Sequence, residues 1–347
     1  MNSNRVSVLG AGNGGFAITA GLTEAGYDVT LFATPEHDSN LQAAIERGGI
    51  ETRGSMETFV EPYSMTTDPT EAMADASLVL VPVPAYGHRD IAKQCLPHAS
   101  DGQTIALLPG YGSSVLYRSL LKEWDLDIDV TVGECSVIPY ACRISGPGEV
   151  TIQGSVTLFG AAYPAADNKQ FFADLERYFE FVQLNNVFES MVKNPNPVIH
   201  PLPSLLNIGS IDRRNAQISL YGEGMTERVL RGLHAVDAER QKIVASMGIE
   251  PTDIDGIYEL LGTGPIYRQG MNTDADHFLE RFIVEDVPYG LRPWLSAGKA
   301  LGVDMPLIRG IIEFASELWE ADYMKNGRTI ENLGLDPASV RRQFGGE

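Results

Sequence analysis

The sequence predicts an α/β chain with two domains: a doubly wound parallel sheet over residues 1–192, followed by an all-α domain over residues 193–347. Three observations support this prediction. The chain opens with a strand, a glycine-rich turn and a helix, alternating apolar strands and helices continue to about residue 190, and only helical periodicity follows. A length of 347 residues, 44% of them hydrophobic, is enough for two cores.

The composition excludes several classes of partner. A net charge of −20 argues against nucleic acid and against an anionic membrane surface, since both need cationic faces. Cys95, Cys135 and Cys142 are an odd number with no C-x-x-C spacing, so neither a disulfide framework nor a metal site is expected. The first strand begins too close to Met1 for a secretion signal, and no uncharged run is long enough to span a membrane. We therefore expect a soluble, cytoplasmic protein.

The opening turn carries the most specific motif. An apolar run ends in Gly10-Ala11-Gly12-Asn13-Gly14-Gly15, and a helical stretch and a second strand follow. This Gly-x-Gly-x-x-Gly pattern between strand and helix is the dinucleotide fingerprint of an N-terminal Rossmann-type domain. Gly10 permits the tight turn, Gly12 lets the backbone approach a pyrophosphate, and Gly15 lets the helix pack on the strand. Amide groups from Asn13 and Gly14 onward would bind the phosphates.

The end of the second strand bears on the choice of cofactor. An acidic residue there normally binds the adenosine ribose, whereas a nearby Arg favours a 2′-phosphate. Residues 33–37 provide neither at the usual place. Thr34 and His37 could receive a 2′-phosphate, and Glu36 could bind a ribose diol. Both NADPH and NADH remain possible, and the missing carboxylate slightly favours NADPH.

Further strands are predicted at residues 77–84, 103–108, 129–132, 149–153, 155–159 and 182–184, with helices at 88–96 and 168–178. Ligands of open α/β sheets bind outside the carboxyl ends of the strands, so Pro84 is expected to contact the cofactor. His88 and Arg89 fit a solvated helix start better than a binding site. Glu134 and Arg143 follow a later strand and are candidates for substrate binding.

A proline-rich break at residues 193–197 separates the two predicted domains. After it, helical stretches are predicted at residues 203–210, 224–247, 253–261, 275–282, 292–301 and 306–324. Gly248 suits the position just after the longest of these helices. No strand pattern appears after residue 190, so the second domain should be all α.

His200 is the main candidate for acid/base chemistry. It lies between a run expected to be extended and a helix start, and Pro201 disfavours the helical conformation in the residue before it. Asp286 could fix the tautomer of His200 and raise its pKa, leaving the second ring nitrogen to exchange a proton. Arg281 could bind a carboxylate bidentately. Without the rest of the chain, the local sequence favours a packing or surface role for His200 and a solvated turn at Glu285-Asp286.

Four segments, in this order and spacing, resemble the octopine/nopaline dehydrogenase family, the opine dehydrogenases, over nearly the whole chain. They are Leu9-Gly10-Ala11-Gly12-Asn13-Gly14-Gly15, Pro139-Tyr140-Ala141-Cys142-Arg143, Asn196-Pro197-x-x-His200-Pro201, and Glu285-Asp286-Val287-Pro288-Tyr289-Gly290-Leu291. Residues 327–329 and 333–335 also fit. The resemblance implies that His200 and Asp286 form a catalytic dyad and that Arg281 binds a substrate carboxylate.

The resemblance also implies a reaction. Opine dehydrogenases use NAD(P)H to condense an amino acid reductively with a 2-oxo acid such as pyruvate, through an imine, and they catalyse the reverse. The expected partners are these small molecules, bound in a cleft between the domains of a monomer or homodimer. The sequence does not identify the amino acid, the oxo acid or the physiological direction.

Two other functions remain as alternatives. One is a ketopantoate- or 3-hydroxyacid-type NAD(P)-dependent carbonyl reductase, which acts without an amine. Such enzymes use a catalytic lysine, and Lys193, Lys242 and Lys299 stand in no motif that we recognise. The other is a non-catalytic dinucleotide-binding sensor, against which the retained His200, Arg281 and Asp286 argue.

Overall fold

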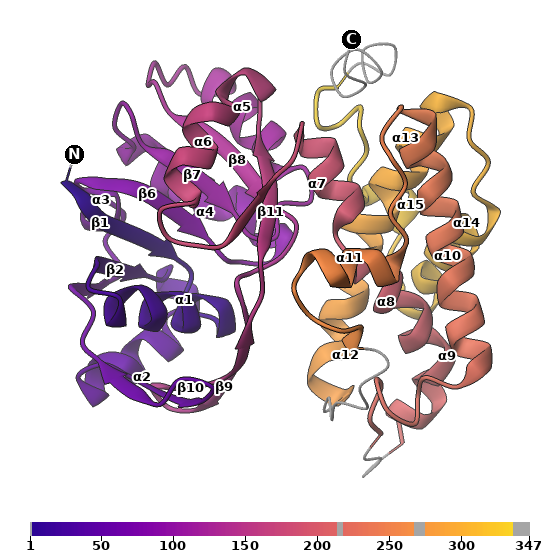
Figure 1. The fold of residues 1–347 in the computed structure, drawn as a ribbon, viewed down its shortest axis with the longest axis horizontal. Helices are drawn as coiled ribbons and strands as arrows, with labels where there is room; N and C mark the ends of the chain where they lie inside the picture. Colours follow the sequence, from indigo (N-terminus) through magenta and orange to yellow (C-terminus); the bar gives the residue numbers. More distant parts are fainter. Residues whose placement is uncertain (1, 214–217, 267–274, 336–347) are drawn as a thin grey trace. The chain divides into compact units, whose positions relative to one another are not determined.

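A computed structural model describes residues 2–213, 218–266 and 275–335. The chain divides into two compact units, Met1–Ser190 and Met191–Glu347. Figure 1 draws the first unit in indigo to magenta and the second mostly in orange to yellow. The sequence places this division after residue 192.

The first unit is built on an eight-stranded sheet. Its strands are β1 (Asn2–Leu9), β2 (Asp28–Phe32), β5 (Ser64–Thr66), β6 (Ala76–Val81), β7 (Thr104–Leu107), β8 (Thr131–Cys135), β11 (Leu158–Ala162) and β12 (Phe181–Gln183). They lie in the order β12-β11-β8-β7-β6-β1-β2-β5. Neighbouring strands are parallel except β11 and β8, which are antiparallel. The predicted parallel sheet is therefore confirmed with one antiparallel pair.

Helices cover both faces of this sheet. They are α1 (Asn13–Glu24), α2 (Ser39–Arg47), α3 (Pro69–Met73), α4 (His88–Cys95), α5 (Ser113–Glu123) and α6 (Asn168–Leu175). Leu78 and Leu80 of β6 belong to one core together with residues of α1 and α6. Val79 and Val81 belong to a second core with residues of α3, α4 and α5. Alternate side chains of one strand thus face two helical layers, as in a doubly wound fold.

A second, four-stranded sheet is absent from the sequence prediction. It contains β3 (Ile50–Gly54), β4 (Thr58–Val60), β9 (Tyr140–Gly146) and β10 (Glu149–Ser155), in the order β4-β3-β10-β9. Only β10 coincides with a predicted strand. It pairs in parallel with β3, far away in sequence, and antiparallel with β9. Val150 and Ile152 of β10 share a core with α1 of the nucleotide-binding turn.

The second unit is helical, which confirms the second half of the fold prediction. Its elements are the end of α7 (Val187–Lys193), α8 (Asn196–Ile199), α9 (Pro201–Ile211), α10 (Glu227–Ser246), α11 (Ile254–Leu260), α12 (Ala275–Val284), the π-helix η6 (Asp286–Leu291), α13 (Arg292–Leu301), α14 (Pro306–Leu318) and α15 (Tyr323–Asn326). No strand occurs in its described part. Gly248 follows α10 with φ +73°, as predicted. The predicted helix 306–324 is interrupted after Leu318.

A buried arginine fixes the start of this unit. The Arg240 guanidinium on α10 bonds Asp237, with 2.8 Å between Nε and Oδ1, and donates to the Val192 carbonyl at 2.9 Å. The indole of Trp294 donates to the Met191 carbonyl at 3.3 Å. Because both bonds go to backbone carbonyls, they hold the segment that leads to His200 against α10 and α13.

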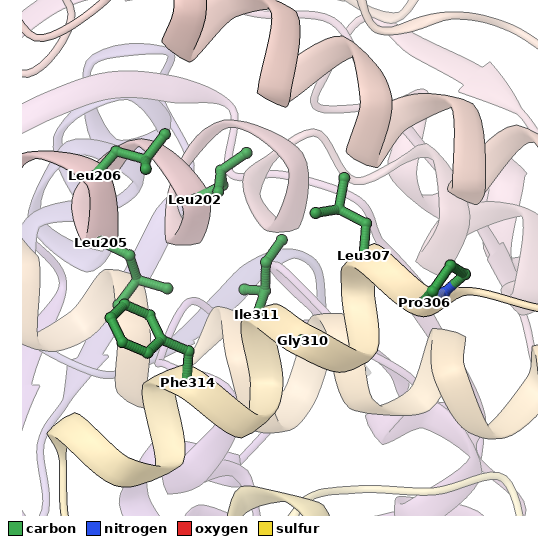
Figure 2. A pocket seen from close by; sticks show the side chains of 8 residues that line it. All are labelled: Leu202, Leu205, Leu206, Pro306, Leu307, Gly310, Ile311 and Phe314. Carbon is green, nitrogen blue, oxygen red and sulfur yellow. The ribbon is translucent and has the colours of Figure 1, made fainter.

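An apolar groove lies between α9 and α14. Figure 2 shows Leu202, Leu205 and Leu206 of α9 with Leu307, Ile311 and Phe314 of α14. These side chains line a groove with a volume of about 180 Å³. Leu206 and Phe314 are 57% and 52% exposed. The groove has no charged side chain in its lining, so it does not suit a carboxylate ligand. No helix in the described part of the chain is long and apolar enough to cross a membrane.

Candidate active site

The glycine-rich turn combines two close contacts with one open position. A Cβ on Gly15 would lie 1.7 Å from the Gly10 carbonyl oxygen, so α1 can approach β1 only with glycine there. Gly10 has φ +133°, and a Cβ on it would lie 2.4 Å from Val83 Cγ1. A Cβ on Gly12 would meet no atom within 4 Å among residues 2–213, 218–266 and 275–335. The turn therefore leaves space for a phosphate beside Gly12, at the N-terminus of α1.

A cavity of about 730 Å³ opens at this turn, within the size range of cofactor pockets. Four of the residues predicted to bind cofactor line it: Gly10, Gly12, Thr34 and Pro84. Asn13, Gly14 and Gly15 do not belong to its lining. The lining also includes Asn40, Val83, Tyr86, Gly87, Lys93 and Gln94. The residues that follow β1, β2 and β6 thus share one pocket.

Two kinds of group meet at the β2 end of this pocket. Thr34 Oγ1 lies 3.1 Å from His37 Nδ1, and the exposed Glu36 lies beside them in the lining. The Glu36 carboxylate suits a ribose diol, whereas the hydroxyl and the ring suit a phosphate. The pocket therefore holds groups for both forms of the cofactor.

The side chain of Asn13 has a structural contact. Its Oδ1 accepts a hydrogen bond from the Ile144 amide at 2.8 Å, and its carbonyl accepts one from the Cys142 thiol at 3.3 Å. These bonds join the first turn of α1 to β9. The motif around Cys142 and Arg143 is thus linked to the nucleotide turn through β9, which the sequence prediction left unassigned.

His200 lies between α8 and α9, not after an extended run as predicted. Its φ of −98° and ψ of −62° are helical, although Pro201 follows it. The amide of His200 donates to the Asn196 carbonyl at 3.0 Å, and its carbonyl accepts from the Ser204 amide at 3.1 Å. These two backbone bonds outweigh the preference imposed by the proline, so the prediction of an extended elbow was wrong.

His200 and Asp286 form a buried pair. His200 Nδ1 lies 2.6 Å from Asp286 Oδ2, and their side chains are 5% and 2% exposed. Since the carboxylate accepts a hydrogen bond from Nδ1–H, the second ring nitrogen Nε2 is left to exchange a proton. Burial lowers the pKa of His200 below its ordinary value of 6.5, and this effect exceeds the opposing effect of Asp286. Asp286 itself raises the pKa of His200, as predicted, and the net decrease comes from burial, which the sequence prediction did not include.

Asp286 is the first residue of the π-helical segment η6, which Glu285 separates from α12. Glu285 and Asp286 are only 1% and 2% exposed, so the solvated turn that spacing favours is wrong. Single π-helical turns inside helices are common at functional sites. The amide of Arg328 donates to the Pro288 carbonyl of this turn at 2.8 Å, and the Arg328 guanidinium lies 4.8 Å over the Tyr289 ring. The late Gly327-Arg328-Thr329 motif therefore packs against η6.

Aromatic rings and a cation surround the pair. The Phe282 ring stacks on the His200 imidazole, with 3.6 Å between ring centroids and 12° between ring planes. The Tyr221 ring also stacks on the imidazole, with 6.3 Å between centroids and 28° between planes. Arg281 is 42% exposed, lies with Cζ 5.7 Å over the Phe282 ring, and has Nη1 3.7 Å from Glu285 Oε2. The three predicted residues His200, Asp286 and Arg281 thus belong to one cluster, to which the structure adds Tyr221 and Phe282.

Glu134 has an intramolecular role that spacing did not indicate. Its fully buried carboxylate accepts hydrogen bonds from the Gly112 amide at 2.9 Å and from Ser114, at 3.0 Å to the amide and 2.6 Å to the hydroxyl. It thereby satisfies amides at the N-terminus of α5. These bonds give no support to the predicted contact with substrate.

Two further residues considered in the sequence analysis are Arg143 and His88. Arg143 lies half-buried on β9, opposite Thr151 in the four-stranded sheet. His88 is fully buried, with Nδ1 2.6 Å from Ser113 Oγ and Nε2 3.0 Å from the Val83 carbonyl. The prediction of a solvated helix start at His88 was therefore wrong. Its ring instead joins α5 to the loop after β6.

The chain is similar to known proteins over nearly its full length. Residues 183–319 match the family described as NAD/NADP octopine/nopaline dehydrogenase, alpha-helical domain, and residues 6–158 match ketopantoate reductase PanE/ApbA. An opine dehydrogenase of Arthrobacter sp. (strain 1C) is 32% identical, with 96% of both chains covered. Octopine dehydrogenase of Pecten maximus is 23% identical, with 97% of this chain and 95% of the relative covered.

Solved structures share the fold. Octopine dehydrogenase with NADH and L-arginine has a TM-score of 0.75 at 19% identity, covering 99% of this chain and 98% of its own. Yersinopine dehydrogenase with NADP⁺ bound has a TM-score of 0.66 at 16% identity, covering 98% of this chain and 97% of its own. Structures with this fold therefore exist with either form of the dinucleotide.

Proposed function

Since this chain belongs to the octopine/nopaline (opine) dehydrogenase family and is an NAD(P)-dependent oxidoreductase of that type, we propose that it condenses an amino acid reductively with a 2-oxo acid, such as pyruvate, and catalyses the reverse. An imine is the intermediate. The observation that carries this proposal is the buried His200–Asp286 pair, with 2.6 Å between Nδ1 and Oδ2. A neutral imidazole held in one tautomer can act as a general acid/base.

In this proposal, His200 transfers the proton. When bound, the reduced nicotinamide would supply the hydride that the imine carbon needs. The imine nitrogen then needs one proton to become a secondary amine, and protonated His200 donates it from Nε2. In the reverse direction neutral His200 accepts that proton from the amine. Asp286 keeps Nδ1–H directed at its own carboxylate and stabilises the positive charge when the ring is protonated.

Arg281 is proposed to bind a substrate carboxylate. Its guanidinium is partly exposed and lies over the Phe282 ring, which stacks on His200. A guanidinium can form two parallel hydrogen bonds with a carboxylate, which would place the adjacent carbon and nitrogen beside the imidazole. Arg281→Ala should therefore mainly raise the KM of one acid substrate. Weaker binding of the dinucleotide in this variant would contradict the role.

For the cofactor, we propose that residues 1–190 bind either NADH or NADPH, with a slight preference for NADPH. The space at Gly12 and the cavity around it fit a dinucleotide phosphate. The Thr34–His37 pair would hold the 2′-phosphate, since no arginine or carboxylate follows β2 directly. Measuring kcat/KM with NADH and with NADPH tests this preference.

A screen of amino acids against 2-oxo acids, with NADH and with NADPH, tests the proposed reaction. Oxidation of the cofactor should require both substrates, and mass spectrometry should detect the N-(1-carboxyalkyl) amino acid. Oxidation with an oxo acid alone would instead identify a carbonyl reductase, the alternative that the ketopantoate reductase match over residues 6–158 supports. Tight dinucleotide binding without oxidation by any pair would indicate a sensor.

A further inference from the structure

The hydroxyl of Tyr221 is a polar group of the His200 cluster that the proposed reaction does not use. The side chain is 4% exposed, and within residues 2–213, 218–266 and 275–335 its oxygen has no hydrogen-bonding partner. Leaving a buried donor without a partner destabilises a protein by about 1–3 kcal/mol. Buried hydroxyls without partners are few in folded proteins, and those beside reactive groups need a functional explanation.

Backbone and side-chain bonds hold Tyr221 in place. It lies in a tight turn in which the Gly224 amide donates to the Ser219 carbonyl at 3.0 Å. Asn207 Nδ2 on α9 donates to the Gly224 carbonyl at 3.0 Å and to the Pro203 carbonyl at 2.8 Å. The turn is thus attached to the helix that starts directly after His200. The Tyr221 ring, stacked on the His200 imidazole, is therefore preorganised.

The hydroxyl keeps its proton and can therefore donate a hydrogen bond. Burial raises the pKa of Tyr221 well above its ordinary value, the negative charge of Asp286 raises it further, and the positive charge of Arg281 opposes them. Asp286 already accepts a hydrogen bond from His200 Nδ1. The acceptor that suits this donor is therefore an oxygen of a ligand bound near Arg281.

We infer that the Tyr221 hydroxyl donates a hydrogen bond to the same substrate carboxylate that Arg281 binds. This inference rests on the proposed function and adds a substrate-binding residue to it. A carboxylate accepts about four hydrogen bonds, and a guanidinium fork uses two of them. The hydroxyl uses a third and fixes the rotation of the carboxylate relative to the His200 ring.

Tyr221→Phe, which removes the hydroxyl and keeps the ring, tests this assignment. We expect a KM about tenfold higher for the substrate that Arg281→Ala affects, because one hydrogen bond to a charged group is lost. The value of kcat should change less than about threefold. In the double variant, KM should increase by a smaller factor than the product of the factors for the two single variants, since both residues bind one carboxylate. An unchanged KM, or an increase for the other substrate, overturns the inference.

Thermal unfolding separates this role from a structural one. Removing a buried hydroxyl without a partner should leave Tm of Tyr221→Phe unchanged or raise it by about 2 °C. The matched control is Tyr117→Phe, because the buried Tyr117 hydroxyl donates to the His88 carbonyl at 3.1 Å. Its Tm should fall. A comparable fall for Tyr221→Phe would assign that hydroxyl a structural partner and overturn the inference.

The two proposals fail in different ways. Wild-type protein that oxidises neither cofactor with any substrate pair contradicts the proposed function and, with it, the role of Tyr221. Wild-type protein that is active while Tyr221→Phe has the same KM values contradicts only the role of Tyr221.

Discussion

The nucleotide turn and the His200 cluster are built in opposite ways. Gly10, Gly12 and Gly15 are almost contiguous, and their roles follow from the local approach of α1 to β1. His200 and Asp286 are 86 residues apart and meet because α9 packs against α12 and α8 packs against η6. A local motif is therefore readable from sequence, whereas the cluster depends on packing of the second unit. Variants of the two regions should separate dinucleotide binding from proton transfer.

The largest effect is expected for His200→Ala. Loss of a general acid/base typically lowers turnover by about 10² to 10⁴-fold, so kcat should fall within that range. The dissociation constant of the dinucleotide should stay the same, because Gly10–Gly15 and the cavity beside them lie in residues 1–190. Steady-state kinetics and fluorescence titration measure the two quantities. A kcat close to that of the wild type would refute the assignment of His200.

Next in size is a matched pair of alanine variants in the turn. Gly15→Ala places a Cβ against the Gly10 carbonyl oxygen, so the free energy of unfolding should fall by about 3 kcal/mol or more. The added Cβ of Gly12→Ala meets no atom of the described residues within 4 Å, so this variant should change the free energy of unfolding by less than about 0.5 kcal/mol. Its dinucleotide affinity should nevertheless fall at least about tenfold, or by about 1.4 kcal/mol.

Chemical denaturation and dinucleotide titration distinguish these two variants. If Gly12→Ala binds the dinucleotide as tightly as the wild type, the space at that position does not hold the phosphate.

A smaller effect is expected for Glu134→Gln. The carboxylate accepts three hydrogen bonds from Gly112 and Ser114, and the amide of glutamine would turn a donor towards them. The free energy of unfolding should fall by about 2 kcal/mol, and the KM values for both acid substrates should stay unchanged. Unchanged stability together with a raised KM would restore the substrate-binding role that spacing suggested.

Much of the fold could be predicted because its signals are local. Apolar runs mark the buried strands of the large sheet, and helical periodicity marks the second unit. The four-stranded sheet could not be predicted, since β4 has three residues, β9 is partly exposed, and β10 pairs with β3 across about a hundred residues. Its existence depends on tertiary contacts that no short window of sequence contains.

The candidate site was predictable only in part. The resemblance to a family pointed to His200, Asp286 and Arg281, which the structure brings into one cluster. The helical backbone of His200 and the burial of Glu285 arise from hydrogen bonds and packing that override local preferences. Tyr221 carries no signal in the sequence, because an unpartnered hydroxyl is a property of its surroundings.

The pH dependence of kcat/KM in the oxidative direction tests the role of the His200–Asp286 pair most directly. His200 must be neutral to accept a proton, so activity should be constant above its pKa and fall as the pH decreases through it. Because burial lowers that pKa, the fall should lie below pH 6.5. Asp286→Asn removes the charge that raises the pKa of His200, so the fall in activity should move to lower pH. In His200→Ala, the residual activity should not show this fall. A fall above pH 6.5, or one that persists in His200→Ala, would contradict the account.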